Sequence, residues 1–189
     1  MKMYSKDYPE KKRMFFSSFG IIGHMTEKNS ADLDDDDKKI LKLIQGNAKM
    51  SMKEISERVG KGISTVHSRI KQMEEDDVIH GYTALVNPNA VDRPVLGFIL
   101  ITVRYRAPGE KQVLSQRQFC QDIAKHPFVM GVHVLSGEYD VILKIRTSTI
   151  EEMNEFIVDF LREIPAVDRT LTMFVMDTYK DSLRIEDIA

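Results

Sequence analysis

The sequence predicts an α+β protein with two domains: an N-terminal three-helix domain of the helix-turn-helix type and a C-terminal ferredoxin-like βαββαβ domain. Two observations carry this prediction. Apolar residues between positions 33 and 79 recur only at helical spacing, whereas positions 94–180 alternate between strand and helix patterns. Between these stretches lie Pro88 and Pro94, among turn-forming Asn and Asp residues that are typical of a linker.

Size and composition fit this division. The chain has 189 residues, of which 42% are apolar and 30% charged, as in ordinary globular proteins. The formal net charge is −2, so any binding of nucleic acid requires a local concentration of positive charge. The expected segments are an N-terminal extension over 1–31, a helix-turn-helix domain over 32–80, a linker strand or hinge over 81–93, a βαββαβ domain over 94–180 and a C-terminal tail over 181–189.

The N-terminal extension has a basic start and a short apolar run from Met14 to Gly23. This pattern resembles a secretory signal peptide, but no small-residue cleavage pattern follows it. We therefore expect a disordered extension, or translated upstream sequence ahead of a start at Met25, on a cytoplasmic protein. No stretch approaches the roughly 20 apolar residues of a membrane span.

The first two expected helices have clear ends. The first begins in the acidic run Asp34–Asp37, where a helix N-terminus is positive, and ends at Gly46-Asn47. The second opens with Ser51 and Glu54 at the spacing of a capping box, and Gly60 suits its left-handed C-terminal position. Two short helices and a glycine-containing turn are the first half of a helix-turn-helix.

The third helix is expected from Ile63 to Asp77, and the stretch from Lys61 to Met73 contains three basic residues and no acidic ones. Early residues of such a helix meet base edges in the major groove, and hydroxyl and basic groups suit phosphates and bases. The alternative is a solvated helix face in a small bundle. The candidate DNA-binding residues are Lys61, Ser64, Thr65, His67, Ser68, Arg69 and Lys71.

The second domain follows the order strand, helix, strand, strand, helix, strand. The clearest element is the helix from Thr149 to Ile164, whose apolar residues recur at helical spacing and which Pro165 terminates. The strands are expected at 95–105, 129–135, 139–145 and 167–179, and the first helix at 111–126. This order is a ferredoxin-like split βαβ with both helices on one face of the sheet.

The other sheet face would then be uncovered, yet the strands are apolar on both sides. Leu96, Phe98 and Leu100 alternate with apolar neighbours along the first strand. A sheet that is apolar on both faces but covered by helices on one requires a partner. We therefore expect a homodimer packed through these sheets.

One tight polar cluster stands at a hairpin, at Ser136, Gly137, Glu138, Tyr139 and Asp140. Glycine lets the backbone come close to a ligand, exposed amides can bind a carboxylate, and Asp140 or Glu138 can bind an ammonium. These groups would suit an amino acid. The alternative is a plain turn.

The sequence offers no catalytic, metal or cofactor site. It shows no nucleophile–base set, no paired catalytic carboxylates and no phosphate-binding glycine loop. Its one cysteine, Cys120, excludes an intramolecular disulfide and a cysteine zinc site, and its apolar helical surroundings predict a buried thiol. The five histidines show no ligand spacing.

Four stretches together resemble the Lrp/AsnC ("feast-famine") transcription regulators: LDDDDKKILKLIQGNAKMSMKEISERVG, STVHSRIKQMEEDDVIHGYTALVNP, VHVLSGEYDVILKI and VMDTYK. The resemblance covers about residues 32–181. It implies a DNA-binding helix-turn-helix, a linker strand, dimers formed through the C-terminal sheets that often assemble to octamers, and an amino-acid effector bound between dimers.

Carried over by residue, the resemblance places Gly137, Tyr139 and Asp140 in the effector site. The last strand would shape this site through Thr170, Met173 and Phe174. The family usually has Leu-Ser before the recognition helix. This sequence has Lys61 and Gly62 there, which predicts a weaker N-cap.

These observations favour a regulator that binds double-stranded DNA as a dimer, with two recognition helices in successive major grooves and an affinity set by an amino acid or similar molecule. One alternative is an architectural DNA-binding protein with no effector. Another is an enzyme resembling siroheme decarboxylases, which would require haem-pocket histidines such as His126 and His133. We expect no enzymatic activity.

Overall fold

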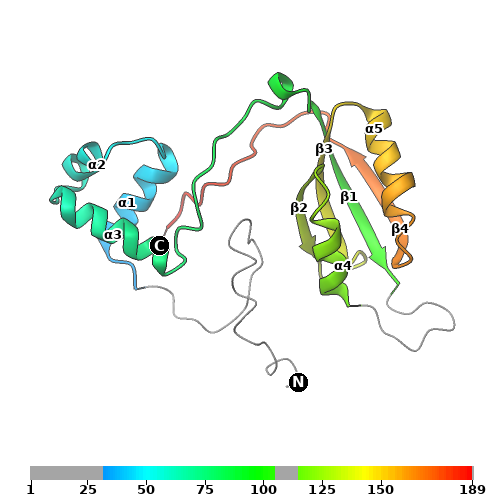
Figure 1. The fold of residues 1–189 in the computed structure, drawn as a ribbon, viewed down its shortest axis with the longest axis horizontal. Helices are drawn as coiled ribbons and strands as arrows, with labels where there is room; N and C mark the ends of the chain where they lie inside the picture. Colours follow the sequence, from blue (N-terminus) through cyan, green and yellow to red (C-terminus); the bar gives the residue numbers. More distant parts are fainter. Residues whose placement is uncertain (1–31, 105–114, 189) are drawn as a thin grey trace, which may run out of the picture. The chain divides into compact units, whose positions relative to one another are not determined.

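A computed structural model describes residues 32–104 and 115–188 (Figure 1). The expected extension over 1–31 and the first part of the helix expected over 111–126 lie outside the described residues. The chain divides into two compact units: one runs to Ala84 and also includes the segment from Ser182, and the other spans Leu85–Asp181. No helix in the described parts is long and apolar enough to cross a membrane.

The first unit is a three-helix domain with the expected helix-turn-helix layout. Its helices are α1 (Asp35–Gly46), α2 (Met52–Val59) and α3 (Ile63–Glu75). Each helix contributes apolar residues to one core, whose members are Ile40, Leu41, Ile55, Val59, Val66, Ile70 and Met73. The core face of α3 therefore fixes which of its residues remain exposed.

Local hydrogen bonds set the helix ends. The Asp34 carboxylate accepts from the backbone N–H groups of Asp36 and Asp37 at 2.9 Å each, which starts α1. The predicted capping box is confirmed: Ser51 N–H donates to Glu54 Oε2 at 2.8 Å, and Glu54 N–H donates to Ser51 Oγ at 3.2 Å. Gly60 ends α2 with a φ of 74°, in the left-handed region that favours glycine.

Residues 81–93 contain no strand in the structure. They hold only the 3-10 helix η2 (Pro88–Val91), preceded by irregular backbone in which Leu85 and Val86 are exposed. An extended segment is a β-strand only when its backbone groups pair with a neighbouring strand, and this single chain provides none here.

The second unit is the expected βαββαβ domain. Its strands β1 (Val95–Val103), β2 (Val129–Val134), β3 (Val141–Thr147) and β4 (Val167–Phe174) form one antiparallel sheet in the order β2-β3-β1-β4. Helix α4 (Gln116–Ile123) precedes β2, and α5 (Ile150–Glu155) continues into the π-helix η3 (Phe156–Leu161) before β4. The apolar spacing predicted one continuous helix here, because that spacing does not distinguish α-helical from π-helical hydrogen bonding.

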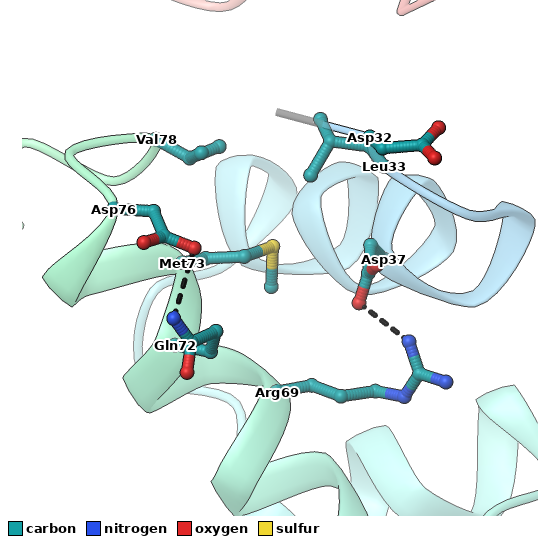
Figure 2. A pocket seen from close by; sticks show the side chains of 8 residues that line it. All are labelled: Asp32, Leu33, Asp37, Arg69, Gln72, Met73, Asp76 and Val78. Carbon is teal, nitrogen blue, oxygen red and sulfur yellow. Dashed lines mark hydrogen bonds and ion pairs between the residues drawn. The ribbon is translucent and has the colours of Figure 1, made fainter. Parts of the chain in front are cut away.

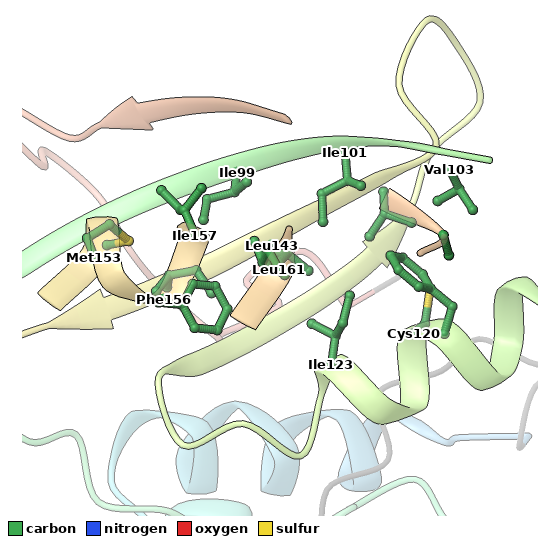
Figure 3. Close-up of a cluster of buried hydrophobic side chains, with 14 residues drawn as sticks. Ile99, Ile101, Val103, Cys120, Ile123, Leu143, Met153, Phe156, Ile157 and Leu161 are labelled. Atoms are coloured by element: carbon green, nitrogen blue, oxygen red, sulfur yellow. The ribbon is translucent and has the colours of Figure 1, made fainter. Parts of the chain in front are cut away.

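Both helical segments cover one face of the sheet (Figures 1 and 3). Ile99 and Leu143 from the strands meet Ile123 from α4 and Leu161 from η3 in a shared core. Cys120 is buried in this core, as predicted, and burial raises the pKa of its thiol.

The opposite face, which we call the open face, carries no helix of the described residues. Directly paired residues share a face of a sheet. Phe98 pairs with Met173, and Leu100 pairs with both Leu171 and Ile142, so these apolar side chains lie together on the open face. Leu171 and Met173 are more than 40% exposed in the single chain.

Candidate DNA-binding surface and effector loop

Five of the seven candidate DNA-binding residues form the exposed side of α3. Val66, Ile70 and Met73 turn toward the core, which leaves the other side of the helix to solvent. The exposed candidates are Ser64, Thr65, His67, Ser68 and Lys71. Lys71 Nζ lies 3.4 Å from Glu75 Oε1, but both side chains are more than half exposed. Such an exposed ion pair stabilises a helix only weakly. This side offers hydroxyls, an imidazole and one ammonium.

The other two candidates form ion pairs with the start of α1. Arg69 Nη1 donates to Asp34 Oδ2 at 2.7 Å and to Asp37 Oδ1 at 2.8 Å (Figure 2 shows the Asp37 contact). Lys61 Nζ lies 2.8 Å from Asp36 Oδ2. The acidic run therefore starts α1. It also forms ion pairs with Lys61 and Arg69, which lie on either side of the first turns of α3.

The pKa values reflect this arrangement. The backbone N–H of Asp37, followed by the Arg69 guanidinium, lowers the pKa of Asp34 to about 2. Hydrogen bonds to Asp37 and Asp34 raise the pKa of Arg69 above its usual range. A shallow pocket opens beside this contact (Figure 2), lined by Asp32, Leu33, Asp37, Arg69, Gln72, Met73, Asp76 and Val78. Its three aspartates do not suit the phosphates of DNA.

Helix α3 begins without a side-chain cap. Its N-cap residue, Gly62, has ordinary extended backbone angles (φ −62°, ψ 148°) and makes no capping hydrogen bond. This agrees with the weaker N-cap predicted from the sequence. The first N–H groups of the helix therefore lack the oxygen that serine would supply.

Tyr82 is a contact of α3 that we did not predict. Its hydroxyl donates to Glu74 Oε1 at 2.8 Å, and burial together with Glu74 raises its pKa to about 12. With Met52, His67 and Lys71 it lines a second shallow pocket at the exposed side of α3. The segment after α3 therefore adds an aromatic group beside the candidate DNA-binding residues.

The five loop residues of the candidate effector site join β2 to β3. Ser136, Gly137 and Glu138 are exposed, whereas Tyr139 and Asp140 are half-buried. A Cβ built on Gly137 would meet nothing within 4 Å. Asp140 Oδ2 accepts from the backbone N–H of Val103 at 2.7 Å, so this carboxylate fixes the loop to the end of β1.

Arg169 on β4 is the main residue of this region that sequence reasoning missed. Its Nη2 lies 3.1 Å from Glu138 Oε1, and its guanidinium lies 5.5 Å from the centre of the Tyr139 ring. Across the sheet Arg169 pairs with Thr102, whose buried Oγ1 has no hydrogen-bond partner among the described residues. The loop and Arg169 together present an anion, a cation and an aromatic face, and the Thr102 hydroxyl is buried beside Arg169.

The three candidates on β4 do not lie together. Thr170 pairs with Ile101, beside the loop, and shares its helix-covered face. Met173 pairs with Phe98 on the open face, about 10 Å further along the strand. Phe174 pairs with Gly97, whose Cβ would meet Met153 at 3.1 Å, so Phe174 lies on the helix-covered face. Of the three, Thr170 alone is next to the loop.

The two histidines considered for a haem pocket differ in their burial. His126 is half-buried among the rings of Phe128, Phe156 and Phe160, with centroids 4.6 to 4.9 Å away. His133 is exposed on β2. Across the described ranges, 32–104 and 115–188, no cluster of His, Cys, Asp or Glu could hold a metal ion.

Known protein families match both units. Residues 33–80 match the winged helix-turn-helix DNA-binding family, and residues 98–185 match the Lrp/AsnC ligand binding domain. The chain is 38% identical over 153 residues to the HTH-type transcriptional regulator FL11 of Pyrococcus horikoshii, which covers 81% of this chain and 95% of that protein. It is 32% identical over 154 residues to the leucine-responsive regulatory protein of Klebsiella pneumoniae, covering 82% and 91%.

Solved structures agree with these matches. The transcriptional regulator NMB0573 of Neisseria meningitidis, in complex with L-Met, is 28% identical and superimposes with a TM-score of 0.72 over 80% of this chain and 94% of that one. An AsnC family regulator from Agrobacterium tumefaciens, 24% identical, shares the fold with a TM-score of 0.72 over 80% and 95%.

The fold and its two candidate sites define a DNA-binding helix-turn-helix joined to a ligand-binding domain, which is the architecture of a transcription regulator. The sequence matches identify it further. The chain belongs to the Lrp/AsnC family of transcription regulators.

Proposed function

We propose that this regulator binds a free amino acid at the loop Ser136–Asp140 and that the bound ligand changes its affinity for DNA. The observation that carries the proposal is the Glu138–Arg169 ion pair beside Tyr139. An α-amino acid is a zwitterion, so its carboxylate can take the place of Glu138 at Arg169 while its ammonium takes the place of Arg169 at Glu138. One exposed protein pair is thereby exchanged for two pairs with the ligand.

Neighbouring groups support this mode of binding. Exposed backbone at Gly137 leaves room for a ligand, and Asp140 holds the loop in place through the Val103 N–H. The NMB0573 structure contains L-Met, which supports an amino acid as the ligand class.

For the DNA side, we propose that α3 enters the major groove with Ser64, Thr65, His67 and Ser68 toward the bases and Lys71 toward a phosphate. All five are exposed on one side of the helix. Arg69 and Lys61 act first by holding α1 to α3, because both are already ion-paired with aspartates.

We further propose that the protein works as a homodimer formed through the open face. Phe98, Leu100, Leu171 and Met173 form an apolar patch on this face, and monomeric soluble proteins rarely leave such a patch exposed. Assembly to an octamer stays a prediction from the family resemblance. The names of the relatives are those of regulators, which supports a cytoplasmic, non-catalytic role.

A screen of thermal stability tests the effector. A ligand that binds only the folded protein raises the unfolding midpoint by linkage. We expect one or a few amino acids to raise the midpoint of the wild type and to have no effect on Arg169→Ala or Glu138→Ala. The matched control is Arg162→Ala, which removes an exposed arginine from the end of η3 and should respond like the wild type. If no amino acid shifts the wild type, an effector-independent architectural role becomes the better account.

A further inference from the structure

The segment Ser182–Ile188 follows the sheet domain in the chain but is part of the DNA-binding unit. It makes three contacts within this unit: Ile185 and Arg184 bond to the end of α1, and Ile188 packs against the core of the three helices. The two polar contacts fix the C-terminal end of α1.

The first contact is a pair of hydrogen bonds between one side chain and the backbone. Ile185 N–H donates to Gln45 Oε1 at 2.8 Å, and Gln45 Nε2 donates to the Ile185 carbonyl at 3.1 Å. The amide of Gln45 thus satisfies both backbone groups of one residue, as a neighbouring strand would. This contact depends on the backbone of Ile185, whose side chain is 69% exposed.

The second contact completes the charge pattern of α1. The helix has Asp35, Asp36 and Asp37 in its first turn and no basic residue in its last. Arg184 Nη2 donates to the carbonyl of Gly46 at 3.0 Å. A cation at the C-terminal end of a helix satisfies an unpaired carbonyl and interacts favourably with the helix dipole. The segment therefore supplies the charge that α1 lacks.

The third contact is apolar. Ile188 is half-buried and packs against the core of the three-helix unit, as Leu43 and Ile44 of α1 also do. Leu183, by contrast, is 71% exposed. Burial is thus confined to the one apolar residue that follows the two polar contacts.

We propose that residues 182–188 form a C-terminal strap that braces α1 and thereby keeps the recognition helix α3 in position for DNA. The strap fixes the end of α1 at Gln45 and Gly46, while Arg69 and Lys61 fix its start at Asp34, Asp36 and Asp37. Helix α1 is then held at both ends, and α3 is held by α1. The bracing is a property of the fold, and its effect on DNA affinity rests on the proposed function.

The test compares two variants at one position in the full chain. Ile185→Pro removes the N–H group that donates to Gln45 Oε1. Ile185→Ala keeps this N–H group and shortens an exposed side chain. A second pair is Gln45→Ala against Lys42→Ala, an exposed residue of the same helix. Hydrogen exchange followed by mass spectrometry reads the peptide that covers α1 and, as an internal reference, the peptide that covers β3.

We expect the amides of α1 to exchange about fivefold faster in Ile185→Pro and Gln45→Ala than in the wild type, because each variant loses hydrogen bonds that hold the end of α1. The β3 peptide and both control variants should match the wild type. Unchanged α1 exchange in both Ile185→Pro and Gln45→Ala would overturn the strap.

The DNA arm uses the duplex that the wild type enriches from a randomised pool. Weaker binding by Ile185→Pro, with Ile185→Ala unchanged, supports the link from the strap to α3. Equal binding despite a loosened α1 overturns that link. If the wild type enriches no duplex, the proposed function fails, and the exchange data still decide whether the strap braces α1.

Discussion

At the scale of single residues, Arg69 shows why a basic residue on a recognition helix need not be directed at DNA. Its guanidinium makes short contacts with Asp34 and Asp37 and is less than one-third exposed. Two carboxylates near one another repel unless a cation lies between them. Arg69 therefore stabilises the start of α1 as well as joining α1 to α3.

Replacing Arg69 by alanine should lower the unfolding midpoint of the protein at pH 7 by about 3 °C, since a partly exposed ion-pair network contributes modestly to stability. Lys71→Ala is the matched control, because Lys71 forms an ion pair with Glu75 alone among the described residues, across an exposed helix face. Differential scanning calorimetry measures both. Equal midpoints for the two variants would mean that the Arg69 contacts contribute nothing to stability.

Lowering the pH should abolish the difference in unfolding midpoint between the wild type and Arg69→Ala. The folded-state pKa of Asp34 is about 2, below its ordinary value of 3.8. A carboxyl with a lowered pKa contributes stability that is present above pH 3.8 and is lost as the pH falls toward 2. The midpoints of wild type and Arg69→Ala should therefore converge over this range.

At the scale of elements, the two glycines that flank the helix-turn-helix turn have opposite requirements. Gly60 ends α2 in the left-handed region, whereas Gly62 precedes α3 with backbone angles open to any residue. A Cβ at Gly62 would meet only Thr65 Oγ1 at 3.8 Å and Ser64 Oγ at 4.0 Å, both ordinary contacts. Only one of the two positions needs glycine.

Gly62→Ser should therefore stabilise the protein, by about 0.3 kcal/mol, because serine caps a helix slightly better than glycine. Gly60→Ser places a side chain at positive φ and should destabilise by about 1 kcal/mol. Chemical denaturation gives both free energies of unfolding. A Gly62→Ser variant less stable than the wild type would contradict the absence of strain at this position.

A second contact joins the turn after α4 to η3. His126 lies among three phenylalanine rings, its Nδ1 accepts the Phe128 N–H at 3.3 Å, and burial lowers its pKa. The neutral ring is therefore the form that fits. Arg93 lies over the Phe128 ring, 5.3 Å from its centroid.

Stability should fall as the pH drops through the titration of His126. With a folded-state pKa below the ordinary 6.5, the contribution is complete above pH 6.5 and is lost as the pH falls toward the folded-state value. His126→Phe should flatten the decline in midpoint between pH 7.5 and 5 by a few degrees relative to the wild type. His133→Asn, at an exposed histidine, should keep the wild-type slope; identical slopes for all three proteins would refute the role of His126.

At the scale of the whole molecule, the predicted features were those that depend on short separations in the chain. Ser51 and Glu54 are three residues apart, and their capping box is confirmed. The order of strands and helices follows from local apolar spacing in the same way. The βαββαβ topology then leaves one sheet face open, as the pattern of apolar strands predicted.

Features set by distant parts of the chain were not predictable. Arg169 reaches Glu138 across 31 positions because β1 lies between β3 and β4 in the sheet, and no local pattern indicates this register. Alternation along β4 does indicate that Met173 and Phe174 point to opposite faces. The contact of Gln45 with Ile185 spans 140 positions and had no signal in the sequence.

Mutation of the open face tests the proposed homodimer. Leu171→Lys places a charge on the open face, opposite Leu100, and should convert a dimer to a monomer at micromolar concentration. Val158→Lys, on the exposed side of η3, should leave the oligomeric state unchanged. Light scattering coupled to size-exclusion chromatography gives the mass. A dimeric Leu171→Lys variant would mean that the subunits associate elsewhere.

The position of residues 182–188 in the chain has a consequence for synthesis. The three helices of the DNA-binding unit leave the ribosome first, and the segment that Gln45 binds follows only after the entire sheet domain has been translated. Until then the last turn of α1 lacks its cation and its backbone partner. A nascent chain thus gains its full set of contacts in the DNA-binding unit only once the ligand-binding half has been made, so an incomplete product lacks the contacts that fix α1.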